Sequence, residues 1–209
     1  MTTPLVTRAV NILTKPAEEW VVIRGETTDT KSLFMGYALP LALIGPVCGL
    51  ISVLLFVGLL GPLGLGAVLM SAIVGAVLGV AISLLAVFLL GIIINALASS
   101  FGTQQNKDQA MKVAVYSMTA SWVAGLLTLV PAVGGLLALL AGLYGFYLLY
   151  LGLQKVMDTP QDKAVIYTLV LFLIMAVILG VAMTIIGVIT AAMMMGAAAA
   201  AGAGAYALS

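Results

Sequence analysis

The sequence predicts an all-α membrane protein whose five transmembrane helices form a compact bundle. Hydropathy is the first indication, because 64% of the residues are hydrophobic, 7% are charged and the mean hydropathy is +1.28. Soluble domains are about half apolar and about a quarter charged. Charge distribution is the second indication, since the eight Lys and Arg and the seven Asp and Glu residues all lie in 1–31, 107–112 and 155–163.

Three stretches without charges, 32–106, 113–154 and 164–209, supply most of the transmembrane helices. About 20 apolar residues cross the ~30 Å hydrocarbon layer, so these stretches fit two, two and one crossings. Gly- and Pro-containing turns at 61–64 and 131–135 divide the first two stretches near their middles. We expect a transmembrane domain over 32–195, with helices at about 32–60, 66–100, 107–130, 135–156 and 160–195, followed by a Gly/Ala-rich outer tail over 196–209.

The predicted topology places the N-terminus in the cytoplasm and the C-terminus outside. With five crossings, residues 1–31 and both charged loops lie on one side of the membrane, together with all eight Lys and Arg residues. The other side receives two uncharged turns and the uncharged tail. Because short loops rich in Lys and Arg face the cytoplasm, we expect a multi-pass protein of the cytoplasmic (inner) membrane.

Residues 1–31 are expected to form an amphipathic segment on the cytoplasmic surface of the membrane. One face of its first helix is apolar and consists of Leu5, Ala9, Ile12 and Leu13, with Arg8 elsewhere. Pro16 then starts a second short helix, because proline is favoured in the first helical turn. Trp20 on that helix is a candidate interface anchor. The sequence therefore favours a helix pair that lies on the leaflet.

The two polar loops precede helices and carry most of the remaining charge. Asn106 and Thr159 are candidate N-caps, and Asp108 and Asp162 follow them in first turns, where carboxylates are favoured. Capping and topology are one explanation of these charges, and a docking surface for a cytoplasmic partner is the other. The candidate partner surface comprises Trp20, Arg24, Lys107, Asp108, Lys112, Lys155, Asp158, Asp162 and Lys163.

Every crossing also carries a stripe of small residues at helical spacing. The stripe positions with functional interest are Ser83, Ser117, Ser121, Thr128, Gly180 and Thr184. Small residues let transmembrane helices approach closely, so we interpret the stripes as packing surfaces. The alternative is a pore or cleft lined by the Ser and Thr side chains. Pro40 and Pro46 should kink the first crossing, since each removes a backbone hydrogen bond.

The amino-acid composition argues against catalysis. The chain has no histidine, and its single cysteine, Cys48, lies inside an expected transmembrane helix. A nucleophile–histidine pair or a zinc site is therefore not expected. The uncharged crossings also lack the groups that proton-coupled transporters and voltage sensors use. We predict a non-enzymatic protein with no cofactor and no metal.

Three stretches resemble a known family. They are "NILTKPAEEWVVI" at 11–23, "NKDQAMKVAVYS" at 106–117 and "LYGFYLLYLGLQKVMDTPQDKAVIYTL" at 143–169. In these the chain resembles the prokaryotic form of the Yip family of Ypt- or Rab-interacting membrane proteins. The resemblance implies five crossings, a cytoplasmic N-terminus and a short outer tail.

Eukaryotic relatives in that family bind prenylated Rab-type GTPases and act in vesicle formation and membrane shaping. Their cytoplasmic Asp-Leu-Tyr-Gly-Pro motif does not occur in this sequence, and "LYGF" at 143–146 lies inside an expected helix. The resemblance therefore does not carry Rab binding over to this chain, and it implies no catalytic residues.

Taken together, the sequence predicts a protein that organises membrane lipid or partner proteins through residues 1–31 and the charged loops. The alternative is a passive channel or facilitator for a small solute, lined by Ser, Thr and Gly. The expected partners are the lipid bilayer and a membrane or cytoplasmic protein, with no nucleic acid. Self-association through one stripe is compatible with either function. If residues 1–25 form a surface module, the bundle should fold and insert without them.

Overall fold

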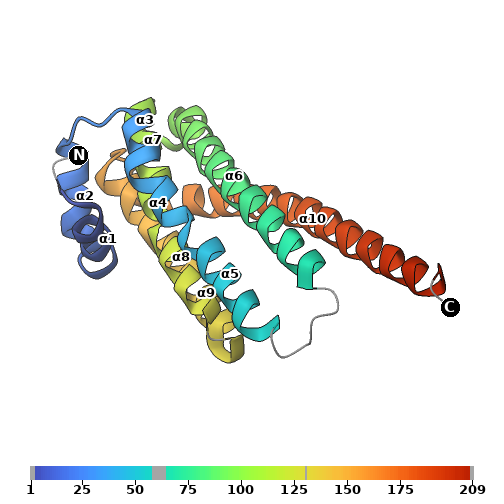
Figure 1. Ribbon diagram of the computed structural model, residues 1–209. Helices are drawn as coiled ribbons and strands as arrows, with labels where there is room; N and C mark the ends of the chain where they lie inside the picture. The colour runs from blue at the N-terminus through green and yellow to red at the C-terminus, as the bar shows by residue number, and fades with distance from the viewer. Residues whose placement is uncertain (1–2, 58–64, 130, 208–209) are drawn as a thin grey trace.

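The computed structural model describes residues 3–57, 65–129 and 131–207, and in these residues the regular secondary structure consists of helices joined by short loops (Figure 1). Five segments are long and apolar enough to cross a membrane: Thr30–Leu55, Val68–Phe101, Lys107–Leu129, Leu136–Lys155 and Gln161–Gly196. The prediction of an all-α membrane protein with five crossings is therefore confirmed. The expected helix ranges agree with these segments to within two residues, except for the expected end of the first helix at 60, which lies outside the described residues together with the expected turn at 61–64. The turn expected at 131–135 is not one, because these residues are helical.

The first crossing is interrupted near its two prolines, as predicted. It consists of α3 (Thr30–Leu33), a π-helical turn η1 (Phe34–Ala38), α4 (Leu39–Ala42) and α5 (Ile44–Val57). Pro40 has no N–H to donate within the helix, and the wide π-helical turn lies directly before it. There the Leu39 N–H donates to the Phe34 carbonyl, five residues earlier. The next interruption, at Leu43, lies three residues before Pro46.

The second and third crossings are joined by a short polar loop. They consist of α6 (Leu65–Leu97) with a 3-10 turn η2 (Ala98–Phe101), and of α7 (Lys107–Ser117), α8 (Thr119–Val123) and the 3-10 segment η3 (Ala124–Leu129). Gly102 ends η2 in the left-handed region at φ +76°, which favours glycine. Asn106 caps α7 as predicted, because its side-chain oxygen accepts from the Gln109 N–H at 3.1 Å.

The fourth and fifth crossings are α9 (Pro131–Lys155) and α10 (Gln161–Ala207). α10 packs against α6 and α9, and its C-terminal part extends beyond the other helices (Figure 1). No interruption marks residue 196, where we expected the outer tail to begin, and the helix continues to Ala207. The Ala-rich composition that suggested a tail is also a composition with high helix propensity.

The core is centred on α7, which lies between α6, α9 and α3 and is buried over most of its length. Three aromatic side chains meet there edge to face. The Trp20 and Tyr116 ring centroids are 6.3 Å apart, and those of Tyr37 and Tyr116 are 4.7 Å apart. The Tyr37 hydroxyl bonds with the Thr119 hydroxyl at 2.9 Å. The best-packed part of the bundle is therefore the part around α7.

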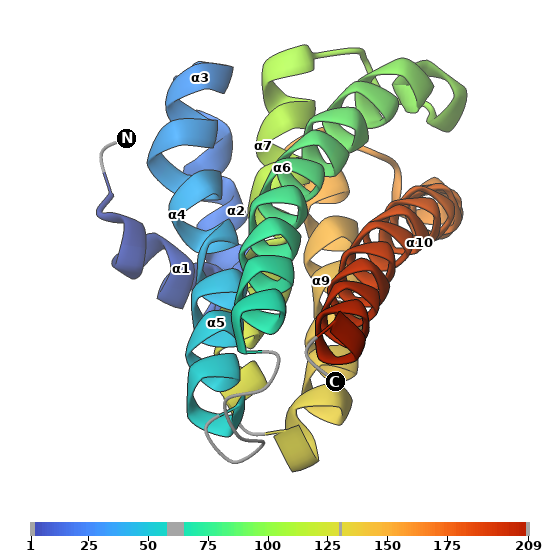
Figure 2. The same ribbon diagram turned by 45° about the vertical axis from the view of Figure 1, so that its right-hand side comes forward.

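The N-terminal helices differ from the prediction in what they contact. α1 (Leu5–Thr14) and α2 (Pro16–Gly25) are separated at Pro16 as expected, but they pack on α8 and α9 at the side of the bundle (Figures 1 and 2). Ile12, Trp20 and Ile23 are fully buried against these helices. The expectation that the apolar face lies on lipid was therefore wrong. We call α1 and α2 the N-terminal hairpin.

Candidate functional site

The polar loops and the end of the N-terminal hairpin meet at one end of the bundle. We call this the charged end and define it as residues 24–31, 102–112 and 155–163. It lies where α3 and α7 begin, at the top of Figure 2. Every charged side chain of the chain except four in the N-terminal hairpin belongs to it.

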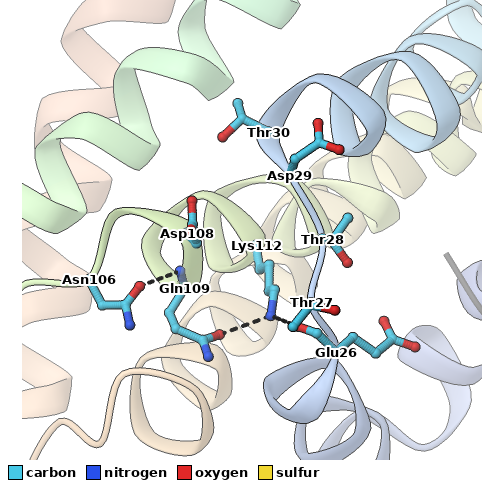
Figure 3. Close-up of a pocket in the computed structure, with 9 residues that line it drawn as sticks. All are labelled: Glu26, Thr27, Thr28, Asp29, Thr30, Asn106, Asp108, Gln109 and Lys112. Carbon is cyan, nitrogen blue, oxygen red and sulfur yellow. Dashed lines mark hydrogen bonds between the residues drawn. The ribbon is translucent and has the colours of Figure 1, made fainter.

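A polar pocket of about 610 Å³ opens at the charged end, between the linker after α2 and the first turns of α7 (Figure 3). Its lining consists of Glu26, Thr27, Thr28, Asp29, Thr30, Asn106, Asp108, Gln109 and Lys112. All of these side chains are polar, and three of them are carboxylates. The pocket therefore joins the N-terminal region to the loop before the third crossing.

Helix starts position the carboxylates at the rim of this pocket. The Asp29 side chain accepts from the Ser32 N–H at 2.8 Å and from the Ser32 hydroxyl at 2.7 Å, and it thereby caps α3. The N–H donation lowers the pKa of Asp29 below its ordinary value, so this exposed carboxylate is ionised at neutral pH. Asp108 is likewise exposed, in the first turn of α7. Both carboxylates are stabilised by the positive ends of helix dipoles.

Lys112 forms the inner wall of the pocket. It is 3% exposed, and its ammonium donates to the Ile23 carbonyl at 3.1 Å, to the Gln109 amide oxygen at 3.3 Å and to the Glu26 carbonyl. An ammonium has three donors, and these three acceptors use them. Ile23 and Glu26 lie at the C-terminal end of α2, where a cation stabilises the last carbonyls. Lys112 therefore caps the C-terminal end of α2.

A buried ion cluster lies behind the pocket. Arg8 is 2% exposed, pairs with both Glu19 and Glu26 and lies over the Tyr116 ring at 5.7 Å from its centroid. Asn11 adds a hydrogen bond to Glu19 at 3.1 Å. Buried charges are costly unless they are paired and hydrogen-bonded. The cluster therefore holds α1, α2 and the linker in one arrangement on α7.

Arg24 connects the end of α2 to both charged loops. Its guanidinium makes two hydrogen bonds with the Asp158 carboxylate, at 2.6 and 2.5 Å, and one with the Lys155 carbonyl at 3.3 Å. The Gln109 amide in turn donates to the Arg24 carbonyl at 3.1 Å. The ion pair is solvent-exposed, so it is worth about 0–1 kcal/mol. Asp158 is also the one described non-glycine residue with a left-handed φ, +54°.

The sequence of the chain is similar to a known protein family. The family model of the Yip1 domain matches residues 10–183. The chain belongs to the Yip1 family. No curated protein and no solved structure matches it significantly. The Yip1 domain begins within α1 and ends within α10, so it includes the polar pocket, both charged loops and the Glu19 and Glu26 carboxylates of the ion cluster, whereas Arg8 lies before the matched residues.

Most of the candidate partner surface lies exposed at the charged end of the Yip1 domain. The exposed members are Arg24, Lys107, Asp108, Lys155, Asp158, Asp162 and Lys163. Trp20 and Lys112 have to be removed from this surface because they are buried. The Trp20 ring packs over Gly152, at whose position a Cβ atom would lie 3.0 Å from it. Trp20 is therefore a core residue and not an interface anchor.

Thr159 does not cap α10 as expected. It is 4% exposed, and its hydroxyl has no hydrogen-bond partner among the described residues. The Pro160 carbonyl accepts from the Ala164 N–H at 2.9 Å, so Pro160 takes the N-cap position, directly before the first residue of α10. The residue type at this loop was right for a cap, but Thr159 faces the protein interior.

The small-residue stripes have different environments. The stripe of the third crossing packs on the first crossing: the Cα of Gly45 lies against Gly125, and the Ser52 hydroxyl donates to the Thr128 carbonyl at 2.9 Å. Ser83 accepts from the Trp122 indole at 3.1 Å. Ser117 and Ser121 line a small, almost wholly apolar cavity of about 140 Å³. In α10, by contrast, Gly180 and Thr184 are exposed on the outside of the bundle.

The sequence interpretation missed the linker that forms one wall of the pocket. Residues 26–30 read "ETTDT", a run of five polar residues directly before the first crossing. That polar run was the feature of the sequence that could have indicated a polar surface at this position. Gln109 and Arg8 were also missed, since neither carries a motif and their importance comes from tertiary contacts.

Proposed function

We propose that this Yip1-family protein is a non-enzymatic organiser of the cytoplasmic membrane that binds a partner protein in the polar pocket. The concentration of Lys and Arg at the charged end supports a cytoplasmic orientation for that end, by the positive-inside rule. The observation that carries the proposal is the pocket of about 610 Å³ at the charged end, with Asp29 and Asp108 exposed at its rim. A pocket of this size accommodates side chains of a bound segment.

The charges of the pocket favour a cationic partner. Asp29 and Asp108 are exposed carboxylates, whereas the ammonium of Lys112 is buried and hydrogen-bonded to carbonyls at the C-terminal end of α2. The accessible charge of the lining is therefore negative. Complementary charge steers association and suppresses wrong partners, so the partner segment should present Lys or Arg side chains.

Charge reversal at the rim tests this proposal. A photo-crosslinker at Thr28 in the full-length protein, in its native membranes, should capture a partner that the Asp29→Lys/Asp108→Lys variant recovers about tenfold less, which corresponds to ~1.4 kcal/mol. Asp162→Lys is the matched control, since Asp162 is also an exposed first-turn carboxylate at the charged end but lies outside the pocket. Equal recovery from the double variant and the control would contradict the proposal.

The channel alternative receives less support from the positions of its lining residues. Gly180 and Thr184 are exposed on α10, while Ser83 and Ser117 are hydrogen-bonded to neighbouring groups. We expect sealed liposomes that contain the purified protein to leak ions and small solutes no faster than liposomes without protein. Leak that increases with the amount of folded protein and decreases in Ser121→Leu would make this a channel-type protein.

A further inference from the structure

The N-terminal hairpin stands alongside the fourth crossing. Three contacts establish this: the Leu13 carbonyl accepts from the Tyr144 hydroxyl at 2.8 Å, Trp20 packs on Gly152, and Arg24 binds the Lys155 carbonyl. Residue numbers increase in the same direction along the hairpin and along α9 through these three contacts. α2 therefore runs parallel to the last turns of α9, from the level of Tyr144 to the charged end.

The outer face of the hairpin carries four exposed valines, with the exposed Thr7 on α1 and the exposed Glu18 on α2 beside them. Val6 and Val10 on α1 are 69% and 51% exposed, and Val21 and Val22 on α2 are 58% and 49% exposed. The opposite faces carry the buried Arg8, Ile12, Trp20 and Ile23. The hairpin is thus a layer whose inner face packs on the protein and whose outer face offers four valines. We call these four residues the valine face.

The depth of α9 in the membrane determines what covers the valine face. Tyr144 lies eleven residues before Lys155, which is about 16 Å along a helix. The headgroup region on each side of the ~30 Å hydrocarbon layer is several ångströms thick. A hairpin that extends about 16 Å from the charged end therefore passes the headgroups and ends within the near half of the bilayer.

The outer surface of α9 continues in the same way toward the other end. Leu139, Leu140 and Leu143, next to the Leu13–Tyr144 contact, are 61%, 52% and 55% exposed. These residues belong to a membrane-spanning segment. Lys15 and Glu18 are exposed at the connection of the hairpin, which is its end farthest from the charged end, so in the bilayer their long side chains have to extend back along α2 to place the charges at the headgroups. The hairpin therefore lies next to a lipid-exposed surface of α9.

We propose that the valine face contacts the acyl chains of one leaflet, the one on the side of the charged end. The hairpin is then neither a cytoplasmic domain nor a sixth crossing. It also shields the Arg8–Glu19–Glu26 cluster from water on the outer side, which strengthens these ion pairs relative to pairs in solvent.

Fluorescence quenching by lipids tests the depth of the hairpin. Val10→Cys and Val21→Cys, each in a full-length Cys48→Ala background, are labelled with the fluorophore NBD and reconstituted in phosphatidylcholine vesicles. The vesicles contain a lipid with a nitroxide at acyl carbon 5 or at carbon 12. We expect blue-shifted emission and a larger loss of intensity with the carbon-5 quencher than with the carbon-12 quencher.

Two labelled variants calibrate the measurement. Lys107→Cys lies exposed at the charged end and should be quenched by aqueous iodide and not by lipid. Leu139→Cys lies deeper on α9 and should be quenched more strongly by the carbon-12 lipid. If positions 10 and 21 behave like position 107, the hairpin lies in water and the proposal is wrong. If they behave like position 139, confinement to the near leaflet is wrong. Neither outcome depends on partner binding in the pocket.

Discussion

Single residues set the distances between helices in this bundle, and Gly125 is the sharpest case. A Cβ atom at Gly125 would lie 2.6 Å from the Cα and 2.7 Å from the nitrogen of Gly45. Backbone atoms cannot move aside as the end of a side chain can. In lipid, where the hydrophobic effect does not drive helices together, such close contacts supply the dispersion that holds them.

We therefore expect Gly125→Ala to lower the free energy of unfolding by about 1–3 kcal/mol, the range of overpacked cores. Thermal denaturation in detergent, followed by size-exclusion chromatography, measures this change. Gly45→Ala is the matched control on the other side of the same contact, because its Cβ would meet the Gly125 Cα at an ordinary 3.6 Å. Equal stability of the two variants would contradict the structural account.

At the scale of elements, the polar pocket depends on the contact by which Lys112 caps the C-terminal end of α2. The ammonium binds the carbonyls of Ile23 and Glu26, and Glu26 begins the linker that lines the pocket. Loss of the ammonium would leave both carbonyls without that donor. The Ile23 carbonyl would keep the Glu26 N–H as a donor at 3.3 Å, so the loss is that of hydrogen bonds to a charged group, which are worth about 1.5–3 kcal/mol each.

Lys112→Met, which keeps most of the side-chain volume, should therefore loosen the end of α2 and the linker. Trypsin cleaves after Arg24, so we expect faster cleavage there in Lys112→Met than in the parent protein. Lys107→Met is the control, because Lys107 is exposed at the start of the same helix. An unchanged cleavage rate in Lys112→Met would show that other contacts hold the C-terminal end of α2 in place.

The elements were largely predictable from the sequence, while their contacts were not. Charge positions and the Asn106 cap gave the helix starts, and Pro16 divided the hairpin correctly. Periodicity identified the inner face of α1, which includes Ala9 and Ile12, but it assigned that face to lipid. Protein core and acyl chains are both apolar, so a pattern that identifies a buried face cannot distinguish between them.

The polar pocket illustrates the same limit. Its walls come from residues 26–30 and 106–112, which tertiary packing alone brings together. Arg8 looked like the polar side of an amphipathic helix, and only its partners Glu19 and Glu26 explain why it is buried. Lys112 was expected on the partner surface, but its ammonium donates hydrogen bonds to backbone carbonyls, and no sequence motif indicates those contacts.

At the scale of the whole molecule, the N-terminal hairpin is part of the folded bundle. Residues 1–25 include Ile12, Trp20 and Ile23, all fully buried, and they cover Tyr116 on α7. The burial of these residues argues against the expectation that the bundle folds without them, which stays a prediction. Removing the hairpin would expose Tyr116 and leave Lys112 without the Ile23 carbonyl.

We expect deletion of residues 1–25 to lower the thermal midpoint of the detergent-solubilised protein and to increase its aggregation. Val22→Ala, on the exposed face of the hairpin, should leave the midpoint close to that of the parent. Size-exclusion profiles after heating compare the three proteins. A deletion variant as stable as the parent would mean that the hairpin rests on a bundle that is already complete.

The position of the hairpin has a mechanical consequence. Two extra helices beside α9, confined to the half of the molecule near the charged end, give the protein a larger cross-section in that half. With its valine face in one leaflet, the protein would displace more area in that leaflet than in the opposite one. A bilayer relieves such an imbalance by bending, with the wider side on the convex surface. The protein would then concentrate on curved membrane, and at high density it would generate that curvature itself.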